Sequence, residues 1–269
     1  MTNSASGAGL AAKVAVQMYT IRDFTKTAAD LASSLKRIAA IGYPAVQLSA
    51  VGAMNGDSPE VSAAQARKML DDNGLRCIAT HRSWDDLTKR TDAEIAFHKT
   101  LGCDYVAIGG VPGSFREAGA DGYRRWAAEA AELCARLAKD DIRFGYHNHD
   151  FEFERAGEGR KSFYDILIEE GGPLLTFEMD VYWVDHAGVN PVRVIERLHG
   201  KLPVIHIKDK EVMKGKPVMA PIGEGNLDWP ELIPALQAAG TQWYAVEQDE
   251  CQRDPFECLR SSYEFLAGF

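Results

Sequence analysis

The sequence predicts a closed (β/α)8 barrel, and three observations support this. The chain has 269 residues, which suits a barrel of this type. Short apolar runs rich in β-branched residues alternate with longer stretches whose apolar residues recur three and four apart. This alternation repeats eight times without interruption, so one domain over residues 1–269 is expected. A doubly wound open sheet is the second interpretation, but no Gly-x-Gly-x-x-Gly motif follows the first apolar run.

The strands are expected where short apolar runs are bounded by turn residues. In chain order they cover residues 14–20, 45–50, 76–81, 105–110, 143–149, 174–180, 203–209 and 243–249. Helical patterns lie between them, for example over residues 27–42, 121–140 and 190–200. Four glycines precede strands where a left-handed residue can end a helix: Gly42, Gly74, Gly102 and Gly240. Parallel strands buried on both faces need helices outside them, which favours closure into a barrel.

The composition is that of an ordered globular protein, with 46% hydrophobic and 26% charged residues. The net charge of -9 and the scattered basic residues disfavour binding to nucleic acid. Five cysteines lie far apart without a Cys-x-x-Cys pair, which is typical of reduced thiols in a cytoplasm. No secretion signal and no apolar run of about 18 residues occurs, so we expect a cytoplasmic protein that does not enter membranes. Residues 1–12 are expected to be a flexible N-terminal segment.

Polar residues gather at the ends of the last four predicted strands, which is where barrel enzymes carry their active sites. They are His147, Asn148, His149, Glu178, Asp180, His206, Lys208, Asp209, Glu247, Gln248 and Asp249. Residues of this kind need partners when buried. A structural polar network is one solution, and convergence on a cation is the other. Because four neighbouring strands share the pattern, we predict one divalent metal ion, for which imidazole and carboxylate ligands suit Mn, Co, Zn, Fe or Ni.

Further side chains near the same mouth are candidates for contacts with a substrate: His81, Trp183, Gln17 and Asn148. For Lys208, an ion pair with Asp209 or with a neighbouring carboxylate is the alternative to a role in binding substrate. Three histidines in helical or loop contexts are expected at the surface: His98, His186 and His199.

Several motifs along nearly the whole chain resemble the xylose isomerase-like TIM-barrel superfamily, in particular its sugar phosphate isomerase/epimerase proteins. They are VQMYTIRD (16–23), IGYPAVQLS (41–49), GYHNHDFEF (145–153), MDVYWVDHAGVNP (179–191), HIKD (206–209), IGEGNLDW (222–229) and VEQD (246–249). The resemblance implies one divalent ion, most often Mn, with Co, Mg, Zn or Fe as alternatives. The ligands that it implies are His147, Asp180, His206 and Glu247. This chain departs from many relatives in having His147 and Gln47 where those relatives have glutamate.

A site of this kind supports abstraction of a proton next to a carbonyl group. Glu247 is the first candidate for the base. His149 or Glu152 is the candidate for returning the proton, and Lys208 for neutralising the oxyanion.

The first hypothesis is therefore a divalent-metal-dependent isomerase or epimerase that acts on a free, phosphorylated or keto sugar. A lyase or dehydratase of keto-sugars or keto-inositols, including one that cleaves 3-keto-glycosides, is the alternative that the histidine-rich fifth strand keeps open. A metal-dependent phosphodiesterase or endonuclease is disfavoured by the negative charge, and a sugar-binding barrel without catalysis is the last alternative. IGEGN (222–226) is the nearest approach to a phosphate loop. The expected partner is a small-molecule sugar, and such families often form homodimers.

Overall fold

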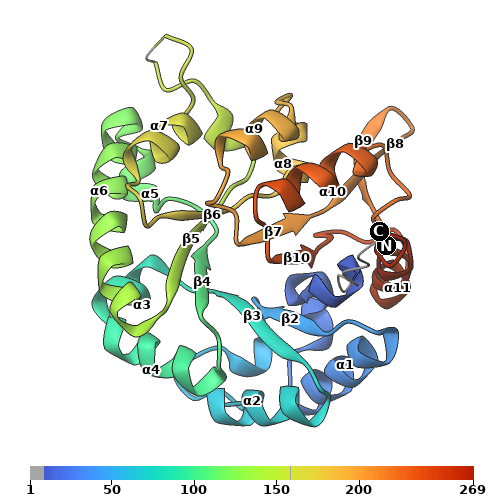
Figure 1. Ribbon diagram of the computed structural model, residues 1–269. Coiled ribbons are helices and arrows are strands. Elements are labelled where there is room, and N and C mark those ends of the chain that lie inside the picture. The colour runs from blue at the N-terminus through green and yellow to red at the C-terminus, as the bar shows by residue number, and fades with distance from the viewer. Residues whose placement is uncertain (1–8, 158) are drawn as a thin grey trace, which may run out of the picture.

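The computed structural model describes residues 9–157 and 159–269, which form a (β/α)8 barrel (Figure 1). Eight parallel strands pair in the ring order β6-β5-β4-β3-β2-β1-β10-β7. They are β1 (Val14–Gln17), β2 (Ala45–Leu48), β3 (Arg76–His81), β4 (Tyr105–Ile108), β5 (Arg143–His147), β6 (Thr176–Glu178), β7 (Val204–Ile207) and β10 (Trp243–Val246). A parallel bridge between Asp180 and His206 joins β6 to β7, where His206 N donates to Met179 O at 2.9 Å. The ring is therefore nearly closed, as the sequence predicts.

The helices lie outside the strands and surround them (Figure 1). They are α1 (Ala28–Ile41), α2 (Ala63–Asp72), α3 (Trp84–Lys89), α4 (Thr91–Leu101), α5 (Gly113–Arg116), α6 (Gly119–Leu137), α7 (Phe163–Glu170), α8 (Val181–His186), α9 (Pro191–Arg197), α10 (Trp229–Ala238) and α11 (Pro255–Leu266). Short 3-10 turns add η1 (Leu10–Lys13), η2 (Met18–Phe24), η3 (Gly52–Met54), η4 (Ala138–Asp140) and η5 (Phe151–Phe153).

Local sequence signals set the helix ends. Thr27 and Ser162 each accept a hydrogen bond from the third helical N–H, and the aspartate at that position bonds back, which completes a capping box. The four glycines predicted to end helices all adopt positive φ. The strands begin within two residues of their predicted starts. Several end two or three residues early, because the chain turns away at the mouth of the barrel.

Small side chains, together with Ile78 and Tyr105, fill the interior of the barrel below its mouth. The interior cluster is separate from the larger core between strands and helices, and it comprises Ala15, Ala45, Ile78, Ala79, Tyr105, Ala107 and Val204. Tyr105 crosses this space so closely that a Cβ at Gly145 would lie 1.8 Å from its Oη. The barrel is therefore packed below the mouth, and side chains that meet a ligand must lie at its end.

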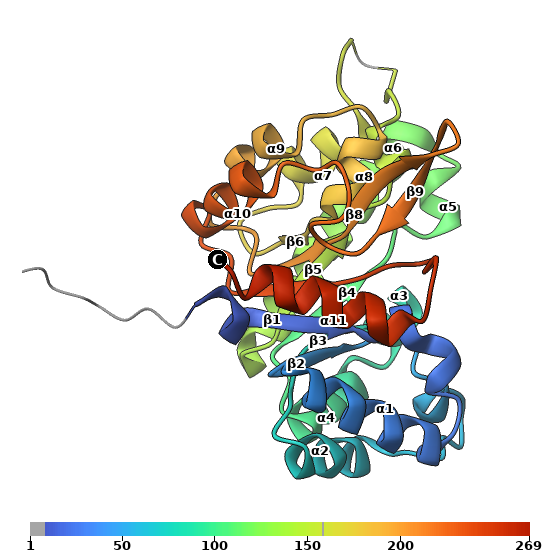
Figure 2. The same cartoon turned by 90° about the vertical axis from the view of Figure 1, so that its right-hand side faces the viewer.

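An antiparallel hairpin of β8 (Asp209–Met213) and β9 (Lys216–Ala220) follows β7 and is absent from the prediction. Its strands carry charged residues and are largely exposed at the tip, where Val212 is 62% exposed, so no buried apolar pattern marks them. Figure 2 shows the hairpin standing at the end of the barrel where the strands finish.

The structure also bears on the expectations for the N-terminal segment and for the three histidines predicted at the surface. Of residues 1–12, residues 1–8 lie outside the described part, while Leu10–Lys13 form η1 and Leu10 is buried. His98 is buried rather than exposed, because it lies on the inner face of α4 and bonds to Thr80 Oγ1 and to Glu94 O, each at 2.7 Å. His186 and His199 are exposed, as predicted. Within residues 9–157 and 159–269, no helix combines the length and the apolar character needed to cross a membrane.

Candidate functional site

A layer of polar side chains lies directly above the small interior residues. Alternate residues of a strand face the same side, so the interior alanines are followed two residues later by Gln17 on β1, Gln47 on β2 and His81 on β3. The other members of the layer are His147, Glu178, His206 and Glu247. All are buried except His81, which is partly exposed.

Three histidines and one glutamate form the inner group of this layer: His81, His147, Glu178 and His206. Their ligand atoms lie within 4.8 Å of one another. Glu178 Oε2 lies 3.2 Å from His206 Nε2 and 3.6 Å from His147 Nδ1, and it is hydrogen-bonded to His81 Nε2. Its other oxygen accepts a hydrogen bond from Gln47 Nε2 at 2.9 Å.

The environment sets the charges in the inner group. Burial raises the pKa of Glu178, but His206 and His81 outweigh burial and hold the pKa below its usual value. Burial and the neighbouring histidines hold the pKa of His147 well below its usual value, so this ring is neutral. His147 Nδ1 is buried and has no hydrogen-bond partner among the described residues. The group thus combines an ionised carboxylate with an unpaired imidazole nitrogen, which are the donor types that bind transition metals.

A second group surrounds Lys208, whose side chain is 1% exposed. Lys208 Nζ lies 3.1 Å from Asp180 Oδ2, 3.0 Å from Glu247 Oε2 and 3.1 Å from Asp249 Oδ2. Burial lowers the pKa of Lys208, but the three carboxylates raise it above its usual value. The ammonium group is therefore permanently charged and lies between the carboxylates.

His206 separates the two groups. Its Nδ1 lies 2.9 Å from Glu247 Oε2, while its Nε2 faces Gln47 Oε1 at 2.8 Å and Glu178. Asp180, His206 and Glu247 also have ligand atoms within 4.8 Å of one another. Of the ligands that the resemblance implies, His147 thus lies in the inner group, Asp180 and Glu247 lie around Lys208, and His206 belongs to both.

A cavity of about 440 Å³ opens above both groups. It is lined by Gln17, Tyr19, Ser49, Ala50, His81, Gly109, His147, His149, Lys208, Glu247 and Asp249. Burial lowers the pKa of His149 to about 4, so its ring is neutral at pH 7. Trp183 packs beside His149 with ring centroids 5.6 Å apart. The size and the few polar groups suit a small polar ligand.

Asn148 and Glu152 are among the predicted site residues that do not line this cavity, and both have structural partners. Asn148 is fully buried and links the ends of β5 and β6, because its Oδ1 accepts a hydrogen bond from Asp180 N. Glu152 is also fully buried. It accepts hydrogen bonds from Tyr146 Oη at 2.5 Å and from His149 N at 2.8 Å. Both residues fix the backbone that carries His149.

Glu178 was not among the predicted metal ligands, yet it belongs to the inner group. It lies two residues before Asp180 on the same face of the strand, so the sequence alone cannot rank the two. The depth of the residue in the barrel makes the difference, since only Glu178 reaches the three histidines.

The IGEGN segment is already occupied by a carboxylate of the protein. Asp209 is fully buried and accepts hydrogen bonds from the backbone N–H groups of Gly223, Gly225 and Leu227 at 2.9–3.2 Å. It also accepts from Lys210 N and from the Trp229 indole, each at 2.7 Å. A Cβ at position 225 would lie 2.2 Å from Asp209 Oδ1, which explains the glycine. The N–H groups that could hold a phosphate therefore bind Asp209.

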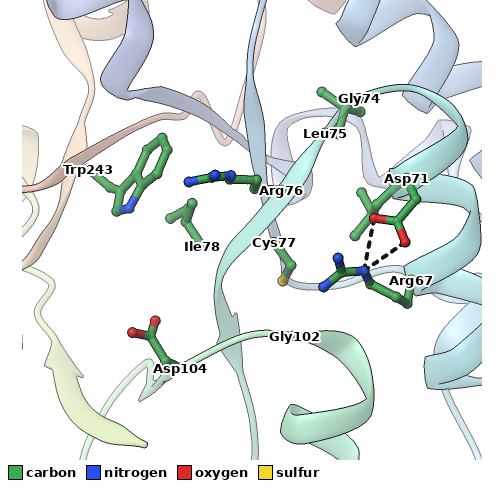
Figure 3. A pocket seen from close by; sticks show the side chains of 11 residues that line it. Arg67, Asp71, Gly74, Leu75, Arg76, Cys77, Ile78, Gly102, Asp104 and Trp243 are labelled. Carbon is green, nitrogen blue, oxygen red and sulfur yellow. Dashed lines mark hydrogen bonds and ion pairs between the residues drawn. The ribbon is translucent and has the colours of Figure 1, made fainter. Parts of the chain in front are cut away.

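A larger cavity of about 510 Å³ lies at the opposite end of the barrel. Arg76 and Trp243 begin β3 and β10 on one side of it, and the Arg67–Asp71 ion pair of α2 lies on the other (Figure 3). The residues around it include no histidine, and this end of such barrels serves stability. The candidate site is therefore the mouth cavity.

Comparisons with known proteins agree with this architecture. A model of the xylose isomerase-like TIM barrel family matches residues 35–267. The structure of a sugar phosphate isomerase/epimerase from Parabacteroides distasonis has a TM-score of 0.79 and 23% identity, with 99% of this chain and 96% of that chain covered. An L-ribulose 3-epimerase has a TM-score of 0.68 and 15% identity, with 95% and 93% covered. The IOLI protein with a bound zinc atom also has a TM-score of 0.68 and 15% identity, with 94% and 95% covered. A comparison with proteins of curated function found no match.

Proposed function

Because the chain belongs to the xylose isomerase-like TIM barrel family, we propose that it is a divalent-metal-dependent enzyme that isomerises or epimerises an unphosphorylated sugar. The observation that carries the proposal is the pair of groups around His206, one suited to a metal ion and one holding a carboxylate beside a buried ammonium. Both groups face one cavity of about 440 Å³. The structural neighbours named as a sugar phosphate isomerase/epimerase and an epimerase support this class of reaction.

The residues present fit a divalent ion. His147 Nδ1 is a buried nitrogen without a partner among the described residues, and it faces an ionised carboxylate. When bound, the ion would polarise the carbonyl group of the sugar and lower the energy of the negative charge that develops there.

Glu247 is the group that abstracts the proton. Burial raises the pKa of Glu247, but Lys208 and His206 outweigh burial and hold it below its usual value, so the carboxylate is ionised at neutral pH. Glu247 lines the cavity, where its carboxylate can accept a proton from the carbon next to the carbonyl. Lys208 Nζ, 3.0 Å from Glu247 Oε2, supplies positive charge beside the developing oxyanion.

His149 is the better candidate for a second proton carrier. It lines the same cavity as Glu247, from the end of β5 rather than β10, and its neutral ring can accept a proton. Glu152 contacts Tyr146 and the backbone N of His149 instead of the cavity, so its role is to position His149. Epimerisation needs two such groups, and isomerisation can proceed with one.

Two observations favour a substrate without phosphate. Backbone N–H groups in and just after the IGEGN segment already donate hydrogen bonds to Asp209. Of the side chains that line the cavity, Lys208 is the sole lysine or arginine, and three carboxylates already surround it. A phosphate dianion would therefore meet net negative charge in the cavity.

Incubation of the protein in D₂O with ketoses, 3-keto sugars and their phosphorylated counterparts tests the proposal by proton NMR. We expect deuterium to enter unphosphorylated sugars at the carbon next to the carbonyl, without loss of a substituent. Glu247→Gln should abolish this exchange, since the amide cannot accept the proton. An unsaturated product would indicate the lyase alternative. Full exchange by Glu247→Gln would show that another group is the base.

A further inference from the structure

Building on the proposed metal dependence, we propose that the divalent ion is held by the inner group, His81, His147, Glu178 and His206. Asp180 and Glu247, two of the ligands implied by the resemblance, then stay outside its coordination.

The first argument is that Lys208 already fills the space between Asp180 and Glu247. Its ammonium group contacts both carboxylates at 3.0–3.1 Å, and its side chain is 1% exposed. A divalent ion between the same carboxylates would lie against this charge in a buried site, where repulsion is strong. Asp180 is further committed, since its Oδ1 accepts hydrogen bonds from Tyr182 N and Trp183 N at the start of α8.

The second argument comes from the two nitrogens of His206. A neutral imidazole offers one N–H and one lone pair. Nδ1 lies 2.9 Å from Glu247 Oε2, and Nε2 lies on the side of the inner group, 2.8 Å from Gln47 Oε1 and 3.2 Å from Glu178 Oε2. An ion in the inner group would take the place of the Nε2 proton, while Nδ1 would keep donating to Glu247. A histidine ligand whose other nitrogen donates to a carboxylate is the usual arrangement around protein-bound metals. Glu247 then orients His206 from outside the coordination sphere.

The third argument is that the inner group is a complete donor set. His147 Nδ1 is unpaired among the described residues and lies 3.6 Å from Glu178 Oε2. Gln47 Nε2 donates to the other oxygen of Glu178, which fixes the carboxylate and which a glutamate at position 47 could not do. Three imidazoles and one carboxylate favour zinc, iron or cobalt over manganese or magnesium, which prefer oxygen ligands.

A pair of matched variants tests the placement. Glu178→Gln and Asp180→Asn each remove one fully buried carboxylate from neighbouring positions of one chain segment. We expect Glu178→Gln to weaken zinc binding by more than the about 10–100-fold that is typical of losing an outer partner. Asp180→Asn should bind zinc nearly as the wild type does. Affinity is measured by chelator competition, and circular dichroism in EDTA checks that each variant is folded. The reverse order of affinities would overturn the proposal.

A second measurement uses the unaltered protein, so that it does not depend on the variants being folded. In a crystal of the zinc-loaded protein, the anomalous difference peak should lie within bonding distance of the nitrogens of His81, His147 and His206. A peak bonded to Asp180 and Glu247 would overturn the placement and leave the proposed function intact. Failure of the wild type to bind zinc, cobalt or manganese would overturn both. Zinc in the inner group without any deuterium exchange would refute the proposed function alone.

Discussion

Asp209→Asn tests how the mouth of the barrel is held in shape. The buried Asp209 carboxylate accepts five hydrogen bonds, and it thereby ties the hairpin to the loop that leads into α10. Oδ1 accepts two of them, from Lys210 N and Leu227 N. Oδ2 accepts three, from Gly223 N, Gly225 N and the Trp229 indole. An asparagine keeps one oxygen and turns an NH₂ group toward the remaining donors.

The expected loss follows from this count. Whichever way the amide is oriented, at least two N–H donors lose their acceptor. Hydrogen bonds to a charged group contribute about 1.5–3 kcal/mol each, so the free energy of unfolding should fall by about 3–6 kcal/mol. That is a large share of the about 5–15 kcal/mol by which domains are usually stable.

Urea unfolding followed by circular dichroism measures this loss. Asp228→Asn is the matched control, because Asp228 is exposed and accepts a single bond from Glu231 N as the N-cap of α10. Asparagine caps a helix as well as aspartate does, so the control should stay close to the wild type. A loss below about 1 kcal/mol in Asp209→Asn, within the range of a single ordinary hydrogen bond, would refute the reasoning that the carboxylate organises this loop.

Three further perturbations follow from the buried groups. Burial raises the pKa of Glu152 from 4.5 to about 7, so the folded state binds the proton more tightly, and stability from this residue falls as pH rises from 4.5 to 7. Glu152→Gln should remove about 3 kcal/mol of that decline, and an unchanged pH profile in urea unfolding would contradict the shift. Gly145→Ala should lower the free energy of unfolding by about 1–3 kcal/mol, because the added Cβ would meet Tyr105 Oη at 1.8 Å; a wild-type melting temperature would argue against this packing. Lys208→Met should cost about 3–5 kcal/mol by leaving buried carboxylates without their partner, and a neutral effect would show that the ammonium is dispensable.

The barrel could be predicted because its signals are local and repeated. Each strand is a short apolar run, and the polar residues at alternate positions past the small interior ones mark the mouth. The same alternation correctly brings His147, Glu178 and His206 into one layer. The hairpin after β7 could not be predicted, since each of its strands is buried at the base and exposed at the tip, so burial does not alternate along the strand.

The sequence alone also could not predict which residues of the site contact one another. Lys208 and Asp209 are adjacent in the chain and invite an ion pair, but successive strand residues point to opposite sides. Lys208 therefore meets carboxylates from neighbouring strands, while Asp209 turns outward to the IGEGN loop. The prediction that His98 lies at the surface was wrong for a related reason. Its two ring nitrogens have hydrogen-bond partners inside the protein, and the pattern of apolar residues in the sequence does not reveal such partners.

Metal-dependent proton abstraction is the central claim, and the effect of metal removal on deuterium exchange tests it most directly. The wild-type protein is stripped with a chelator, incubated in D₂O with a ketose that it accepts, and then supplied with zinc, cobalt or manganese. We predict that exchange at the carbon next to the carbonyl disappears on stripping and returns with the ion. Exchange that continues at full rate in the stripped protein would contradict the account.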